Sequence, residues 1–403
     1  MTVTPNFPPD RRYDLDWIRV GAFALLILYH VGMFYVTWDW HVKSPRQSET
    51  LELLMMGSSP WRLSLLFFIS GCAVRFMADR LGAGRLVWER TARLLPPLLL
   101  AMFVIVPPQS YYELVESLPG WSMDYGAFWL KYASASGHWC DADGCLTTPT
   151  WNHMWFVAYL LVYVQVLSVV LRIARRPLLA LGRALERPLA GAGLLVWPIL
   201  MLAVFRMFLA PRFEITHALI DDWYNHALSF SVFLLGFLTV RSERITEGFV
   251  RLRWPALLLA LTAYAAWATY AWTYRGDDAV PPETLRVCMR VVYAALQWSA
   301  IAAILGFARR RLTRGGPVLR YLTEAVFPFY IVHQTITVVA AHHLARLGLP
   351  VALEAGLLIA ITAGGCLLTF EVVRRVGWLR PLFGLKARPR RQAEPLVPEL
   401  APG

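Results

Sequence analysis

Charged residues are scarce in this chain. Asp, Glu, Lys and Arg together make up only 16% of its 403 residues, whereas 57% are hydrophobic and the mean hydropathy is +0.47. This composition excludes an ordinary soluble globular protein. The sequence also lacks a recognisable soluble catalytic domain and a convincing internal repeat. Any chemistry is therefore expected to lie among apolar helices.

Cysteine is equally sparse, with five residues scattered along the chain. Cys140 and Cys145 share one connecting segment, HWCDADGC, where the oxidising side of a membrane would permit a disulfide. The residues leave open whether the two pair. The intervening DADG is too short for a calcium loop and lacks the distal Glu. We therefore expect no metal site.

Apolar stretches long enough to cross a bilayer recur along nearly the whole chain. The N-terminal stretch is not expected to be a cleaved signal peptide, because it is too long and contains Arg and His. The pattern predicts an all-α, polytopic integral membrane protein with about ten transmembrane helices. The expected spans are 15–36, 61–79, 94–110, 151–173, 189–208, 225–241, 254–273, 286–307, 319–341 and 352–374.

Basic residues predict the orientation. Most of the 39 Lys and Arg residues fall in alternate connecting segments, and acids dominate the others. By the positive-inside rule both termini are cytoplasmic. The net charge of +12 then reflects topology and attraction to anionic lipid, and no nucleic-acid partner is expected. We predict a cytoplasmic segment over 1–13, a membrane domain over 14–380 and a disordered basic, Pro-rich tail over 381–403.

Arg19 and His30 lie eleven residues apart in the first apolar segment. On a helix they return to within roughly 20° of one direction, about 16 Å apart along the axis. Ionisable residues inside a membrane are expensive and are functional candidates by default. The alternative is an Arg anchored at the interface and a His that bonds a neighbouring helix.

Three imidazoles are expected at a similar depth in the outer half of the membrane. His30 lies there in the first segment, His153 opens the fourth, and His333 with Gln334 follows Pro328 in the ninth. His226 begins the sixth segment nearby. Convergence of polar groups in an apolar bundle is typical of an active or binding site.

The inner side carries a different chemistry. A guanidinium fork can pair two phosphate oxygens at once, which suits phosphate recognition. Inner segments are often Arg-rich, however, and residues 172–187 are equally so. The end of the second span and the segment that leads to the third contain five arginines: Arg75, Arg80, Arg85, Arg90 and Arg93.

A phosphate site inside and imidazoles outside together fit an acyl-CoA donor, which has an anionic head and a long thioester arm. A neutral imidazole could then act as general base on an acceptor hydroxyl. The outer segment 111–150 is rich in aromatic residues and could form a short amphipathic helix. Its rings could stack on sugars, although interfacial anchoring is the commoner role of such residues.

Four segments resemble the acyltransferase 3 family of multipass membrane O-acyltransferases. LDWIRVGAFALLILYH resembles its opening signature, and SLLFFISGCAVRFMADR with WERTARLLPPLLL resembles its second-helix signature and Arg-rich loop. HMWFVAYLLVY and FPFYIVHQTITVVAA resemble later signatures, particularly of glucan biosynthesis protein C-like members, which are associated with succinylation of periplasmic glucans. The resemblances come in order and extend over about 14–340.

The resemblance implies an acyl-CoA co-substrate, no permanently bound cofactor and an acceptor hydroxyl on a glycan or glycolipid. It implies that His30, as base, and Arg19 are catalytic. Arg75, and less specifically Arg90 and Arg93, would hold the donor. The remaining substrate-binding candidates are His153, His333 and Gln334.

The sequence thus predicts an acyltransferase of the bacterial inner membrane that moves an acetyl or succinyl group to a periplasmic or cell-surface glycan. A transporter or flippase is the rival, with Arg19 as a counter-charge. A relative that only binds lipid or a partner is a second rival. The acceptor, the acyl chain, the oligomeric state and the choice between direct transfer and an acyl-enzyme stay open.

Overall fold

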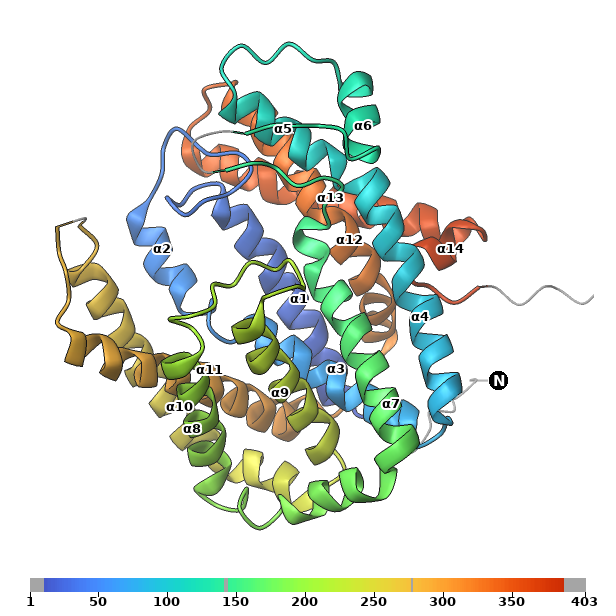
Figure 1. The fold of residues 1–403 in the computed structure, drawn as a ribbon, viewed down its shortest axis with the longest axis vertical. Coiled ribbons are helices and arrows are strands. Elements are labelled where there is room, and N and C mark those ends of the chain that lie inside the picture. The colour runs from blue at the N-terminus through green and yellow to red at the C-terminus, as the bar shows by residue number, and fades with distance from the viewer. Residues whose placement is uncertain (1–10, 141–143, 277, 388–403) are drawn as a thin grey trace, which may run out of the picture.

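The computed structural model describes residues 11–140, 144–276 and 278–387, and these ranges form an all-α fold (Figure 1). The expected tail over 381–403 lies largely outside the described residues. The first half of the fold consists of α1 (Tyr13–Met33), α2 (Glu49–Met56), α3 (Arg62–Ala78), α4 (Ala83–Leu100), the π-helix η1 (Ala101–Ile105), α5 (Pro107–Ser117), α6 (Tyr125–Ala133) and the 3-10 helix η2 (Asn152–Met154).

The second half begins with one of the longest helices of the described chain. Its elements are α7 (Trp155–Ala184), α8 (Gly193–Phe208), α9 (Trp223–Thr239), α10 (Glu243–Thr273), α11 (Glu283–Arg311), α12 (Pro317–Ala345), α13 (Val351–Arg375) and α14 (Leu379–Leu382). Every segment expected to span the membrane is therefore helical.

Fewer helices of the described chain than expected have the length and hydropathy of a membrane span. Six helical stretches of the described chain are long and apolar enough to cross a bilayer, or seven if the bent pair α9 and α10 is one span. That pair turns by 114° at its break, and α8 is apolar but has only 16 residues. A span needs about 20 residues, so these helices support six to seven crossings rather than ten. The inner location of both termini stays a prediction.

Close backbone contact joins α3 to α9 in the core. A Cβ atom on Gly71 would lie 1.9 Å from the carbonyl oxygen of Phe233, and one on Gly236 would lie 2.0 Å from that of Phe68. Small residues allow membrane helices to approach in this way. The contact fixes α3 in the bundle, where α1 packs against α3, α11 and α12. These helices carry most of the residues considered below.

The aromatic segment after α5 forms a small separate core. Leu114, Phe128, Tyr132 and Trp139 are all buried and pack together, and α6 supplies two of them. Cys140 and Cys145 form a disulfide in the same segment. The expected short helix is thus present as α6, which lies with α5 at the top of the bundle in Figure 1.

Candidate functional site

Three histidines from distant segments meet inside the bundle. Nδ1 of His30 on α1 lies 2.7 Å from Nε2 of His333 on α12, and the two rings stack with centroids 4.9 Å apart. The His153 ring, from η2, lies 5.2 Å from that of His333 at nearly a right angle. The convergence expected from depth alone is therefore a direct contact.

Hydrogen bonds fix the proton positions on two of these rings. Nδ1 of His333 lies 2.8 Å from the carbonyl oxygen of Tyr330, and a carbonyl can only accept. His333 therefore carries its proton on Nδ1 and presents a lone pair at Nε2. His30 must then donate from Nδ1, which leaves the lone pair of its own Nε2 uncommitted among the described residues.

Both ring nitrogens of His153 are hydrogen-bonded. Its Nε2 donates to the carbonyl oxygen of Ile331 at 3.1 Å, and its Nδ1 accepts from Nε2 of Gln109 at 3.3 Å. His333 is likewise bonded at both nitrogens. Of the three imidazoles, His30 alone keeps a free basic nitrogen within the part of the chain that the structure describes. It is also the most accessible, since His153 and His333 are 6% and 0% exposed.

Gln334 extends the polar cluster toward α5. Its amide nitrogen lies 2.9 Å from Nε2 of His41 and 3.1 Å from Oε1 of Gln109. His41, in the segment between α1 and α2, donates in turn from Nδ1 to Glu113 at 2.5 Å. Gln334 is 4% exposed, and its amide nitrogen donates both of its hydrogen bonds within this network. Its position suits a residue that orients the cluster.

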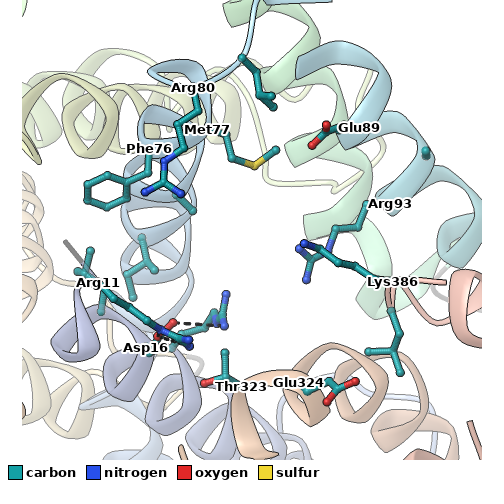
Figure 2. A pocket seen from close by; sticks show the side chains of 18 of the residues that line it. Arg11, Asp16, Phe76, Met77, Arg80, Glu89, Arg93, Thr323, Glu324 and Lys386 are labelled. Atoms are coloured by element: carbon teal, nitrogen blue, oxygen red, sulfur yellow. Dashed lines mark hydrogen bonds and ion pairs between the residues drawn. The ribbon is translucent and has the colours of Figure 1, made fainter. Parts of the chain in front are cut away.

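A cavity of about 1140 Å³ opens at the other end of α1, among α1, α3, α4, α12 and α14. Figure 2 shows Arg80 and Arg93 on facing walls, with Arg11 and Asp16 joined by an ion pair nearby. Three acids line the cavity: Asp16, Glu89 and Glu324. Basic side chains outnumber them: Arg11, Arg12, Arg19, Arg80, Arg93, Arg241, Arg320, Arg380 and Lys386.

Four of the arginines singled out in the sequence gather at this cavity. Arg19, Arg80 and Arg93 line it, and Arg90 is buried close enough to Arg19 and Arg93 to be repelled by their charge. Nε of Arg19 and Nε of Arg90 are buried with no hydrogen-bond partner. Arg19 lies 3.5 Å from Asp16, a loose ion pair. The geometry suits an anion, because charged donors without acceptors are costly when buried.

Arg75 does not line the cavity. Its Nε donates to Asp79 at 2.9 Å, and its guanidinium lies over the Phe237 ring. Asp79 also accepts from the cavity residue Arg241 at 2.8 Å. Arg75 therefore reaches the cavity wall only through Asp79.

A family model described as an acyltransferase domain matches residues 12–371. The chain belongs to the acyltransferase 3 family. It is an enzyme that transfers acyl groups other than amino-acyl groups. Glucans biosynthesis protein C of Salmonella schwarzengrund is 22% identical over 97% of this chain and 99% of its own length, and the Salmonella typhimurium protein is equally similar. The Salmonella paratyphi B protein is 26% identical over 40% of this chain and 39% of its own. No solved structure is significantly similar.

Not every histidine of this acyltransferase joins the cluster. His226 accepts from the Tyr163 hydroxyl at 3.1 Å and donates to the carbonyl oxygen of Leu219 at 2.8 Å. It stacks on Tyr159, whose hydroxyl binds Asp222. His226 thus belongs to a second polar group, and no hydrogen bond among the described residues joins that group to His30.

Sequence reasoning missed part of the acyltransferase's polar network. Gln109 could have been identified from the sequence, because it is an amide inside the expected span 94–110. In the structure it is 0% exposed. His41 and Glu113 lie in connecting segments, where polar residues are ordinary. Only the fold shows that they contact Gln334 and each other.

Proposed function

We propose that this acyltransferase moves an acyl group from acyl-CoA to a hydroxyl of a glycan or glycolipid, with His30 as general base. The observation that carries the proposal is the free Nε2 of His30 beside two fully bonded histidines. A neutral imidazole with one lone pair open is the form that a general base requires.

The donor's phosphates would bind in the arginine-rich cavity. Arg19 and Arg93 would contact them directly, and Arg90 would supply charge from behind. Arg19 and His30 share α1 and are separated by about 16 Å along its axis. An extended thioester arm can cover such a distance. The cavity would therefore lie on the cytoplasmic side and the histidines toward the periplasm, in the bacterial inner membrane.

The transfer step follows from this placement. Nε2 of His30 takes the proton of the acceptor hydroxyl as its oxygen attacks the thioester carbonyl carbon. The tetrahedral intermediate then collapses, the C–S bond breaks, and the departing sulfur recovers the proton from His30. The name of the Salmonella relatives refers to glucan biosynthesis, which supports a glucan as acceptor and leaves the acyl group open between acetyl and succinyl.

We propose a single membrane domain over about 14–380, which agrees with the family match over residues 12–371. The flanks 1–13 and 381–403 are assigned to the cytoplasm by the positive-inside rule alone. His153 and Gln334 would hold the acceptor end of the site in place.

Release of free coenzyme A tests the proposal. The purified protein in nanodiscs, supplied with acetyl-CoA or succinyl-CoA and a glucan oligosaccharide, is expected to release thiol and acylate the sugar. Both signals should require the acceptor. Movement of the oligosaccharide across a vesicle membrane without thioester consumption would instead identify a transporter.

Removal of His333 is expected to slow transfer without weakening donor binding. His333→Ala deletes the acceptor that holds Nδ1–H of His30, so the ring can rotate and change tautomer. Such a hydrogen bond contributes about 1 kcal/mol, which corresponds to a loss of roughly fivefold in kcat. His333→Gln restores an acceptor oxygen and should recover part of the rate. Steady-state kinetics check this, and an increase in KM with unchanged kcat would contradict the positioning role.

A further inference from the structure

Arg62 is a buried arginine outside the cavity proposed to bind the donor. It is the first residue of α3 and is 9% exposed. Its Nε and Nη1 are buried without a hydrogen-bond partner. Within the described ranges no acidic side chain forms an ion pair with it. Its guanidinium stacks on the Tyr29 ring, with Cζ 3.3 Å from the ring centroid.

The surroundings of Arg62 make this arrangement costly. Burial of a cation without a partner is unfavourable, and the N-terminal end of a helix repels positive charge. Stacking on an aromatic face offsets only part of that cost. Burial, with help from the charge of Arg62, lowers the pKa of nearby His217 to about 4, although Asp222 acts in the opposite direction. His217 is thus neutral at pH 7 and supplies no repelling charge, while Asp222 is already bonded to Tyr159 and Asn225.

Arg62 lies beside the proposed base. Tyr29, on which it stacks, directly precedes His30, and the Tyr29 and His30 ring centroids are 6.4 Å apart. The guanidinium therefore lies no farther from the His30 ring than these two distances combined. Its charge also acts on His30. The unpaired Nε and Nη1 lie on different edges of the guanidinium, and each can form with Nη2 a two-donor fork that fits a carboxylate.

We propose that Arg62 binds a carboxylate carried by one of the two reactants next to His30, and that it is a specificity residue distinct from the phosphate-binding cavity. The carboxylate belongs either to the far end of a dicarboxylic acyl group or to an acidic sugar of the acceptor. Its assignment to a reactant rests on the proposed transfer at His30. The short distance between Arg62 and His30 favours the acyl chain as the source of the carboxylate.

The first test measures binding without catalysis. Unfolding temperatures are compared with monomethyl succinate and methyl butyrate, and with glucuronate and glucose, all in an Arg19→Ala background that weakens anion binding in the cavity. The anionic member of one of these pairs is expected to stabilise the protein more than its neutral counterpart. Arg62→Met should abolish the difference and leave the unliganded unfolding temperature unchanged or higher, because an unpaired buried cation is removed.

Arg62→Lys is the second variant if Arg62→Met does not fold. It keeps the charge but loses the fork, so the carboxylate affinity should fall at least tenfold. Arg275→Gln is the matched control, since Arg275 also stacks on an aromatic ring but is exposed and paired with Glu49. Equal stabilisation by both members of each pair in the parent, or a difference that survives both Arg62 variants, overturns the proposal.

Transfer assays identify the source of the carboxylate. With succinyl-CoA and butyryl-CoA as donors, whose acyl groups have the same carbon count, Arg62→Lys is expected to lower the succinyl-over-butyryl ratio of kcat/KM at least tenfold. A change seen only with acidic acceptors would place the carboxylate there. In a further outcome, the protein binds carboxylates through Arg62 and yet transfers no acyl group. That result would support the anion site at Arg62 and contradict the proposed function.

Discussion

Replacement of His30 by alanine is expected to lower the rate of acyl transfer by about 10²- to 10⁴-fold, the usual contribution of a positioned general base. His30 is the one member of the histidine cluster with an uncommitted ring nitrogen, so neither His153 nor His333 can take over without breaking its own hydrogen bonds. Coenzyme A affinity should not change, because the proposed phosphate contacts lie about 16 Å away along α1. Single-turnover transfer and equilibrium binding on the same sample measure the two effects.

His138→Ala is the matched control. His138 is an exposed imidazole in the segment after α6, outside the cluster, and its loss should leave transfer unchanged. An acylated protein that accumulates in the wild type and is missing in His30→Ala would indicate that His30 acts as nucleophile instead. Substantial transfer by a folded His30→Ala protein would remove His30 from the chemistry altogether.

The helical stripe that joins Arg19 and His30 could be predicted from the sequence because it is local. An eleven-residue spacing on a helix fixes a shared direction whatever packs against it. The apolar segments could be placed for a similar reason, since the hydropathy of a window depends only on its own residues. Their classification as spans was less secure, because helix length and the 114° turn between α9 and α10 depend on neighbouring helices.

The hydrogen-bond order within the site could not be predicted. Which imidazole keeps a free nitrogen depends on the contacts of His30, His153 and His333 with carbonyl and amide groups from other helices. The contacts of Arg75 could not be predicted from the sequence either. It aligns with a basic position of the family signature, yet its side chain turns to Asp79, and Arg80 reaches the cavity instead. Sequence spacing predicts a face of a helix but not the partner found there.

Replacement of Arg19 by alanine is expected to weaken coenzyme A binding by roughly tenfold to more than a hundredfold. A hydrogen bond to a charged group contributes about 1.5–3 kcal/mol, and 1.4 kcal/mol is a factor of ten. Arg19 has an unpartnered buried Nε and lies close to Arg90 and Arg93, so the three cations repel one another until an anion binds. The unliganded protein should therefore lose no stability in Arg19→Ala. Titration calorimetry gives the affinity, and thermal unfolding gives the stability.

Arg176→Ala separates a built phosphate site from general positive charge. Arg176 is an exposed arginine of another Arg-rich segment and does not line the cavity, so its loss should leave the affinity for coenzyme A unchanged. Equal weakening by both variants would mean that the arginines act only as diffuse charge. Because the cavity is recessed, binding at Arg19 should also resist added salt more than a surface contact does. Loss of affinity in Arg19→Ala alone, with transfer reduced at low donor and restored at saturation, would place Arg19 at the donor rather than in the chemical step.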